Sequence, residues 1–482
     1  MPDERVLTIL QVNDSHGYLE PHWEWFWRGS TGEHRVAGGY GRIASILAAA
    51  RRERPGAVLA FDCGDTIHGT HAAVASEGQA LVPILNALAF DAMTAHWEFA
   101  YGPARFREIV GQLHYPMLAI NCYDKASDEL AFSPYTICET AGLRVGVIGI
   151  AATIVDKTMP ASFSEGLRFT LGNEELPGYI ARLRHEERVD LILVISHLGF
   201  PQEVQLAEEV SGIDVLLSGH THHRLYRPAV VNGAIIIQSG CHGSFVGRLD
   251  LQVSGGRVTD YTHRLITVDE GVPADPEVEA LAREATAAWR GELAGVVGET
   301  LTPLNRYTVL EATMDNLLLQ ALLHATSAQL AFSNGWRYGA PIPPGPITLN
   351  DLWNIIPVNP PVSICRLTGD ELRAMLEENL EHTFSRNPYN QMGGYVKRCL
   401  GLNAYIKVEN PPGQRIQELF VANEAVRADR TYEATFVTAQ GVPGKYGSDR
   451  QQLDVRAVDA LQRYLARSSP VDARIRGTVM AV

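Results

Sequence analysis

Acidic and histidine side chains gather in five short segments of the first half of the chain, each directly after a predicted strand. The segments read NDSH at residues 13–16, DCGD at 62–65, HWE at 96–98, SH at 196–197 and GHTHH at 219–223. In an open α/β sheet the carboxyl ends of the strands lie along one edge, so residues far apart in the sequence converge there. The pattern therefore predicts one site built from five strand ends.

A cluster of this composition suits a pair of divalent metal ions. Two carboxylates and several imidazoles are costly to bury without a cation, because buried charges need partners and buried ring nitrogens need hydrogen bonds. With two ions, one carboxylate would bridge them, imidazoles would fill the remaining positions, and a water held between them would be acidified into hydroxide. Each fragment alone is an ordinary loop feature, but the five together predict a dinuclear metal site.

The elements that must position this site alternate along the first part of the chain. Up to about residue 265, short β-branched runs alternate with segments of helical periodicity, which predicts an α/β domain with largely buried strands. We expect strands at residues 6–12, 57–61, 91–94, 117–120, 144–150, 190–195, 214–217 and 234–238. We expect helices at residues 41–52 and 79–88 to cover the faces of the sheet.

A polar segment of strong helix formers at residues 273–293 predicts a helix that connects two domains. We therefore divide the chain into a first domain at 1–268 that carries the metal site, a connecting segment at 269–297 and a second domain at 298–482. The second domain is again mixed α/β, with a proline-rich loop at 341–346 and a helix at 369–380.

Composition limits the partners of the protein. The 482 residues are 46% apolar and 20% charged, which is typical of a folded globular protein and excludes a disordered chain. The formal net charge of −14 repels phosphate backbones and anionic lipid, so we expect neither a nucleic-acid polymer nor a membrane as partner. A metal site still attracts small anions, and we expect a small anionic substrate. The oligomeric state is left open.

The compartment is predicted from what the sequence lacks. No apolar run approaches the ~18 residues of a membrane-spanning helix, and the six cysteines are scattered without a CxxC pair, which is typical of reduced thiols. The amino terminus enters the strand at 6–12 without the basic, apolar and small-residue regions of an export signal. These features favour a cytoplasmic protein, or a periplasmic one if an export signal has been removed.

The order and spacing of five motifs resemble those of the calcineurin-like metallophosphoesterases, and specifically of their 5′-nucleotidase family. The motifs read NDxH at 13–16, GG at 38–39 leading into Arg42, DxGD at 62–65, SHLG at 196–199 and GHTH at 219–222. The resemblance covers nearly the whole chain, since the second half is similar to the carboxy-terminal substrate domain of that family. It implies a four-layer α/β/β/α metallophosphoesterase domain joined by a helix to a smaller α/β substrate-binding domain.

The resemblance also implies which side chains hold the ions. One ion would be held by Asp14, His16 and His222, the other by His197 and His220, and Asp65 would bridge them. Mixed nitrogen and oxygen ligands allow Mn, Zn or Fe, so the identity of the two divalent ions is left open.

One motif departs from the family. The family reads Gly-Asn-His-Glu, an aromatic or aliphatic residue and Asp, whereas residues 94–100 read TAHWEFA. Aligned on Glu98, His96 replaces the metal-binding Asn and Trp97 replaces the catalytic His; aligned on residues 91–94, the segment is one residue short. We interpret His96 as a metal ligand of the catalytic centre, because an imidazole replaces an amide oxygen at a metal and an indole neither ligates nor transfers a proton. The alternative is a packed histidine.

The HWEF variant is similar to one in a neighbouring branch, the thiosulfohydrolases of bacterial sulfur oxidation. The loop NGWRYG at 334–339 stands where nucleotidases carry a more glycine-rich loop, and PYNQMGG at 388–394 is also similar to that branch. We expect Asn334 and Arg337 to bind substrate, with the Arg337 guanidinium as a catalytic anion clamp, because a planar guanidinium suits bidentate contact with phosphate or sulfate. The alternative for Arg337 is a surface charge.

Nucleotidases stack the base between two aromatic rings, and Tyr395 and Tyr446 lie near the corresponding loops. Flanking glycines would leave these rings open to a ligand, so we expect both to bind substrate by stacking. The alternative is that both rings are ordinary packing residues.

These features predict a hydrolase of phosphomonoesters, foremost of 5′-nucleotides, in which metal-bound hydroxide attacks phosphorus. Since the catalytic His and its Asp partner are replaced, the leaving group would depend on metal electrostatics, on water, or on His68 or His71, which are otherwise plain loop histidines. Two alternatives are a thiosulfohydrolase-like release of sulfate from a sulfur carrier, where sulfate leaves unprotonated, and a non-catalytic homologue that binds nucleotide or metal.

Overall fold

The computed structural model describes residues 4–482, which form two compact units. The first unit contains the chain as far as His22 and Arg35–Ala288, and the second contains Trp23–His34 and Trp289–Val482. The predicted metal site lies on the first unit and the predicted anion clamp on the second.

Two sheets form the centre of the first unit. One has the order β15-β14-β1-β4-β5, in which β1 runs parallel to β4 and antiparallel to β14. Its strands are β1 (Arg5–Val12), β4 (Val58–Asp62), β5 (Ala92–Met93), β14 (Phe245–Ser254) and β15 (Arg257–Thr267). The other has the order β12-β13-β11-β10-β8-β7, with a parallel centre. Its strands are β7 (Tyr135–Thr140), β8 (Leu143–Ile150), β10 (Leu191–Ser196), β11 (Val215–Ser218), β12 (Ala229–Val231) and β13 (Ala234–Ile237).

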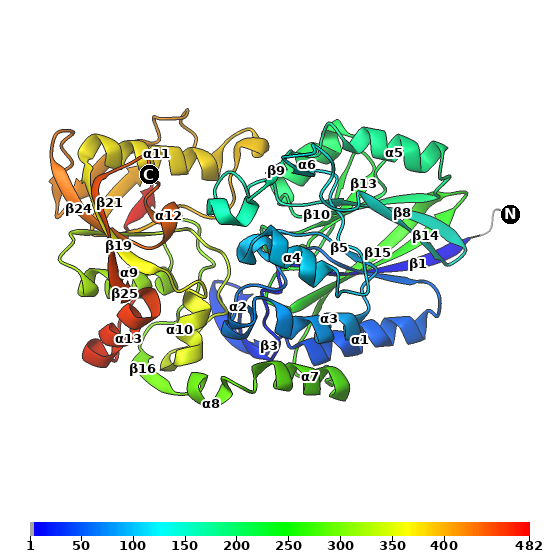
Figure 1. Cartoon of the computed structure of the whole chain (residues 1–482), viewed down its shortest axis with the longest axis horizontal. Helices are drawn as coiled ribbons and strands as arrows, with labels where there is room; N and C mark the ends of the chain where they lie inside the picture. The colour runs from blue at the N-terminus through cyan, green and yellow to red at the C-terminus, as the bar shows by residue number, and fades with distance from the viewer. Residues whose placement is uncertain (1–3) are drawn as a thin grey trace. The chain divides into compact units, whose positions relative to one another are not determined.

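Helices cover the outer face of each sheet, so the first unit has four layers (Figure 1). On one side lie α1 (Tyr40–Glu53), α3 (Val82–Leu88) and α7 (Pro276–Thr286), and on the other α5 (Leu176–His185) and α6 (Phe200–Glu209). Shorter elements complete the unit, namely α2 (His71–Ala75), α4 (Pro103–Val110), β6 (Cys122–Asp124) and β9 (Leu167–Phe169).

The alternation of side chains along β1 shows how this layering arises. Leu7 and Ile9 pack between the two sheets, whereas Leu10 and Val12 pack against the helical layer that contains Ile43 of α1. Successive side chains of a strand point to opposite faces, and both faces of β1 are apolar, so the strand must be covered on both sides. The predicted four-layer α/β/β/α arrangement is confirmed.

The predicted strand at residues 117–120 is wrong. This segment crosses between neighbours instead of pairing with one: Leu118 N–H donates to Met93, Ala119 N–H to Ser133 and Ile120 N–H to Gly149. Its apolar character comes from burial, and an apolar run alone does not distinguish a strand from another buried segment.

The predicted helix at 273–293 is two helices, α7 and α8 (Arg290–Leu293). Asp275 caps α7 by accepting the N–H groups of Glu277 and Val278. At the other end the Thr286 hydroxyl donates back to the Ala282 and Arg283 carbonyls, a contact that weakens the continuation of a helix. The border between the compact units falls in the turn that follows, at Ala288 and Trp289.

The second unit is built on a five-stranded mixed sheet of order β20-β17-β24-β19-β25. Its strands are β17 (Leu330–Ser333), β19 (Pro361–Thr368), β20 (Arg398–Leu400), β24 (Thr431–Phe436) and β25 (Ser448–Arg456). Because β17 and β24 are parallel, the loops that follow them start at the same edge of the sheet. The predicted helix at 369–380 is present as α11 (Gly369–Phe384), which begins with a capping box of Thr368 and Glu371.

Further elements surround this sheet. The helices are α9 (Thr313–Ala325), α10 (Leu349–Ile355), α12 (Thr438–Gly441) and α13 (Ala457–Ser468). The smaller sheets contain β21 (Leu402–Ile406), β22 (Ile416–Val421), β23 (Glu424–Ala425) and β26 (Val479–Ala481), then β16 (Val296–Thr300) with β18 (Gly345–Thr348), and β2 (His22–Arg28) with β3 (Thr31–Ala37). Within residues 4–482, no helix combines the length and apolarity needed to cross a membrane.

The crossing of segment 117–121 over β8 depends on Gly149. A Cβ at this position would lie 2.1 Å from the Leu118 carbonyl oxygen, and backbone does not move away as a side chain does. We expect Gly149→Ala to lower the free energy of unfolding by about 3 kcal/mol, measured by urea denaturation. Gly178→Ala is the control, because nothing lies within 4 Å of a Cβ there. Equal stability of the two variants would contradict this packing.

Candidate metal centre

All seven predicted metal ligands lie in loops that follow strands of the two central sheets. The loop after β1 carries Asp14 and His16, and the loops after β4 and β5 carry Asp65 and His96. The loops after β10 and β11 carry the remaining three, His197, His220 and His222. The structure therefore brings side chains from both sheets to one place.

The seven side chains form two groups that share Asp65. One group contains Asp65, His96, His197 and His220, and the other contains Asp14, His16, Asp65 and His222. Within each group the four ligand atoms lie within 4.8 Å of one another. All of these residues are buried except His222, which is half-buried. One carboxylate common to two sets of donors is the arrangement that a bridged pair of ions needs.

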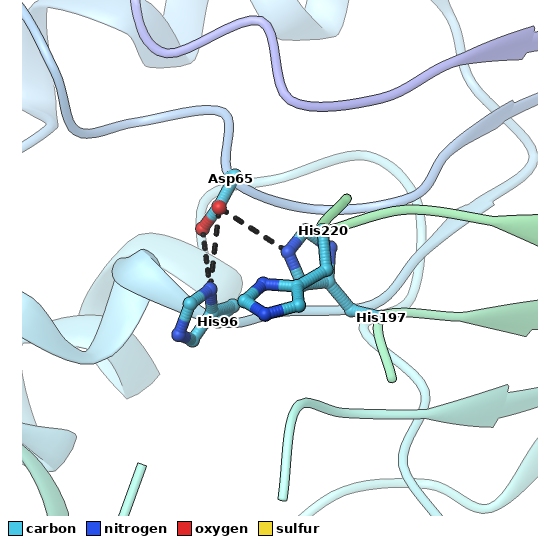
Figure 2. Close-up of side chains that lie close together, drawn as sticks. All are labelled: Asp65, His96, His197 and His220. Atoms are coloured by element: carbon cyan, nitrogen blue, oxygen red, sulfur yellow. Dashed lines mark hydrogen bonds and ion pairs between the residues drawn. The ribbon is translucent and has the colours of Figure 1, made fainter. Parts of the chain in front are cut away.

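Figure 2 shows the first group, with two imidazoles directed at the Asp65 carboxylate and His220 beside them. His96 Nδ1 lies 3.2 Å from either oxygen of Asp65, and His197 Nε2 lies 3.2 Å from Oδ2. His96 is thus placed among the other predicted ligands by its side chain as well as by its loop.

The second group brings two imidazole nitrogens face to face. Nε2 of His16 and Nε2 of His222 are 3.1 Å apart, and His222 Nε2 is 3.2 Å from Asp14 Oδ1. Convergent nitrogen and carboxylate donors at this spacing fit a divalent transition metal, so the side chains present suit the ions that the sequence predicts.

Backbone carbonyls fix the orientation of two of the rings. The carbonyl of His68 accepts a hydrogen bond from His16 Nδ1 at 3.2 Å, and the carbonyl of Cys63 accepts one from His197 Nδ1 at 2.5 Å. A carbonyl only accepts, so Nδ1 of each ring carries a proton and Nε2 is the nitrogen that a metal would bind, in place of any proton there. The outer contacts therefore prepare both rings as ligands.

Five of the seven predicted ligands have left-handed backbone conformations, with φ between 50° and 71°. They are Asp14, His16, Asp65, His220 and His222. Residues with a side chain adopt this conformation at a cost in free energy, and such strain concentrates at functional sites. The strained backbone of these loops directs the side chains toward one point at a cost in the conformational free energy of the loops.

Burial and charge act in opposite directions on the titration of this cluster. Burial, the largest influence, acts to raise the pKa of Asp65, but His96 and His197 outweigh it and hold the pKa well below its usual range. The two carboxylates outweigh burial at His197 and raise its pKa to about 10. At His16 burial dominates and lowers the pKa to about 3. The carboxylates are thus held ionised, as metal ligands must be.

Glu98 is a buried residue, and the sequence analysis did not identify its role in the site. Its carboxylate accepts the backbone N–H groups of Thr66 at 2.6 Å, His96 at 2.7 Å and Asp65 at 3.3 Å. It therefore ties the loop after β4 to the loop after β5. The available signal was an acidic residue between the aromatic residues Trp97 and Phe99, where burial of a carboxylate has to be compensated by hydrogen bonds.

Trp97 contacts a predicted metal ligand through its backbone and a neighbouring histidine through its ring. Its N–H donates to Asp65 Oδ1 at 2.8 Å. Its indole stacks on the His68 ring, with 4.6 Å between centroids and 19° between planes. Burial lowers the pKa of His68 to about 4, so this imidazole is neutral near pH 7. The other histidine named as a possible acid, His71, begins α2.

Three of the four predicted substrate residues gather in the second unit. Tyr395 N–H donates to the Gly335 carbonyl at 2.7 Å, and the Arg337 guanidinium donates to the Gly394 carbonyl at 2.9 Å. Asn334 in the same loop donates to the Gln440 side chain.

The fourth predicted substrate residue, Tyr446, has a different surrounding. Its hydroxyl donates to Glu378 of α11 at 2.8 Å, and its ring packs against the apolar core of the unit. The predicted stacking of a base between Tyr395 and Tyr446 stays a prediction.

Comparison with known proteins finds relatives along nearly the whole length of the chain. Residues 296–439 match the family model of the 5′-nucleotidase C-terminal domain. Over 97% of its length the chain is 23% identical to the 5′-nucleotidase of Vibrio cholerae, and it covers 91% of that protein. It is 24% identical to the trifunctional nucleotide phosphoesterase protein YfkN of Bacillus subtilis over 98% of this chain, which spans only 35% of that longer protein.

Among solved structures, the sulfate thiohydrolase SoxB of Thermus thermophilus, in complex with glycerol, has the same fold. The TM-score is 0.92 at 24% identity, and the match covers 100% of this chain and 98% of that one. The four layers and the two groups of candidate ligands with a common carboxylate fit a hydrolase of the metallophosphoesterase class. The similarity to 5′-nucleotidases extends over nearly the whole chain at 23% to 25% identity, and the family model matches residues 296–439.

A test of His96 is especially informative, because His96 lies in the motif that departs from the family pattern. We expect His96→Ala to lower bound metal from about two ions per chain to about one, because one group loses a nitrogen donor. The measurement is metal content by mass spectrometry after loading with manganese or zinc and desalting. The exposed His114 of the same unit supplies the control His114→Ala. An unchanged metal content in His96→Ala would remove His96 from the ligand set.

Because Gly219 has no side chain, the ring of His197 has room beside it. A Cβ there would lie 2.6 Å from His197 Nδ1 and 2.9 Å from the Cys63 carbonyl oxygen, so it would disrupt the hydrogen bond that orients the ring. We expect Gly219→Ala to weaken metal binding about 10- to 100-fold, as loss of an outer contact does. Competition with a chromophoric chelator measures this affinity. Gly111→Ala, where a Cβ makes ordinary contacts, should bind metal as the unaltered chain does.

Proposed function

We propose that this protein hydrolyses phosphomonoesters at a dinuclear metal centre and that 5′-nucleotides are among its substrates. The observation that carries the proposal is the pair of four-ligand groups with Asp65 in common. Similar proteins support it, because relatives along nearly the whole length of the chain are named 5′-nucleotidases.

Each group of side chains has a part in this proposal. Bound divalent ions supply Lewis acidity and lower the pKa of a water ligand, the chemistry such ions give hydrolases. Asp14 and Asp65 contribute negative charge that retains the cations, and the backbone contacts of His16 and His197 at Nδ1 leave Nε2 as the ligating nitrogen. Arg337 binds oxygens of the anion through a planar, permanently charged guanidinium.

Protonation of the leaving group is the step in which this chain differs from the family that it resembles. Trp97 stands where the family has its catalytic histidine, and an indole donates no proton to an alkoxide. Departure then depends on how well the leaving group carries negative charge. Hydrolysis should therefore be faster for substrates with acidic leaving groups, such as aryl phosphates, than for alkyl phosphates of equal size.

The same observation favours a second candidate, hydrolysis of a sulfur–sulfonate bond to a thiol and sulfate. Attack of water oxygen on the sulfonate sulfur forms sulfate and breaks the S–S bond, and the group that leaves is the thiolate. A thiol has a pKa of about 8.5, so its thiolate leaves more readily than an alkoxide and the loss of a positioned acid costs this reaction less. The likeness of fold to a sulfate thiohydrolase is consistent with this candidate but does not distinguish it from phosphomonoester hydrolysis.

One panel separates the candidates. We expect metal-reconstituted protein to release phosphate from adenosine 5′-monophosphate, and faster from p-nitrophenyl phosphate, with loss of turnover after chelation and recovery on return of metal. Phosphate and sulfate are both assayed, and a low-molecular-mass thiosulfonate is included. Sulfate release alone would replace the proposal by the second candidate. Binding of nucleotide without release of either anion would contradict both and indicate a non-catalytic homologue.

A further inference from the structure

Two arginines in the second unit share one buried carboxylate. Asp315 lies 2.9 Å from Arg306 Nε and 3.0 Å from Arg398 Nε, and the side chains of all three are at most 1% exposed. Two guanidiniums and one carboxylate leave an excess of positive charge inside the protein. Burying such a charge is costly unless hydrogen bonds compensate it.

Backbone carbonyls hold both guanidiniums in place. Arg306 donates to the Tyr338 carbonyl at 2.7 Å and the Ile355 carbonyl at 2.8 Å. Arg398 donates to the Thr308 carbonyl at 2.8 Å and the Val309 carbonyl at 3.0 Å. With these bonds and Asp315, both planar groups are fixed, so they form rigid surfaces for whatever packs on them.

Aromatic rings on both sides of Arg337 pack on these fixed guanidiniums. Arg306 lies over the rings of Trp336 and Tyr338, at 5.6 and 5.8 Å from the centroids. Both rings are buried, whereas Arg337 between them is only half-buried. The backbone of Arg337 is therefore anchored through its two neighbours.

The Arg337 side chain is held by Tyr395. The ring of Tyr395 has the guanidinium carbon of Arg337 at 5.0 Å from its centroid and that of the buried Arg398 at 5.5 Å. The Gly394 carbonyl accepts one N–H of Arg337, and a Cβ at Gly335 would lie only 2.3 Å from the Tyr395 carbonyl oxygen, so the two segments are in close contact.

We propose that Tyr395 is a positioning residue that, backed by Arg398, holds the Arg337 guanidinium ready for an anion. A guanidinium packed by its face on a ring keeps its N–H donors in the plane of the group, directed past the ring edge toward an oxyanion. The proposal deepens the function proposed above and rests on it. It gives Tyr395 a role different from a platform for a base: the second unit recognises the anionic group, whatever the rest of the substrate is.

The test compares Tyr395→Leu and Tyr395→Phe in the metal-loaded full chain. We expect Tyr395→Leu to raise KM about tenfold for both adenosine 5′-monophosphate and p-nitrophenyl phosphate, with kcat changed less. Tyr395→Phe keeps the ring face and should restore KM to near the original value. Tyr405→Leu, at a half-buried tyrosine of the same unit, controls for general loosening. A rise in KM confined to the nucleotide would overturn the proposal, because it would make Tyr395 a base platform.

A second measurement does not depend on turnover. Binding of inorganic phosphate to the metal-loaded protein is measured by calorimetry for Tyr395→Leu, Arg337→Met and the double variant. If Tyr395 acts through Arg337, the double variant binds phosphate as weakly as Arg337→Met alone. Independent, multiplicative losses, or unchanged affinity in Tyr395→Leu, would overturn the proposal. Because no hydrolysis is needed, these outcomes are distinct from a failure of the proposed function.

Discussion

Asp14 and Asp65 lie buried where strands of the first sheet end, and the need to compensate their charge organises the surrounding loops. The second sheet contributes His197, His220 and His222, so the acids come from one layer and three of the imidazoles from the other. In the protein alone His197 acts as the counter-charge, since the carboxylates raise its pKa to about 10. A divalent cation is a stronger partner than an imidazolium, and the same geometry that stabilises one receives the other.

The backbone strain of this arrangement lies in the loops, whereas the packing that stabilises the unit lies in the sheets. The strands β1, β8, β10 and β11 are buried on both faces and make the apolar core. Left-handed φ values at the ligands, and glycines such as Gly219 whose missing side chain leaves room for His197, weaken the loops locally. Such strain persists because the surrounding core over-determines the loop ends. The strands thus supply the stability, and the loops that follow them carry the candidate ligands.

Much of this could be predicted from the sequence because strand and ligand signals are local. Apolar runs located β1, β10 and β11, and the residues directly after them are the ones that meet. The segment at 117–120 was misjudged because burial without a single pairing partner leaves the same apolar pattern as a strand. Arg398 could not be foreseen as an organiser, and for Glu98 the sequence signals only a buried acid, since the roles of both depend on which backbone groups or rings lie opposite them in space. Most of the hairpin of β2 and β3, at Trp23–His34, belongs to the second unit although its residues precede most of the first, and periodicity does not encode this tertiary arrangement.

The span of chain that the ligands bridge has a consequence for how the protein matures. Asp14 and His222 are separated by 208 positions in the numbering, yet they belong to one group of donors. During synthesis the first acids emerge long before the last imidazoles, so a nascent chain has no complete coordination shell to offer. The complete set of donors therefore exists only after both sheets have formed, so an ion that needs all of them would bind to the folded unit and not to the emerging chain.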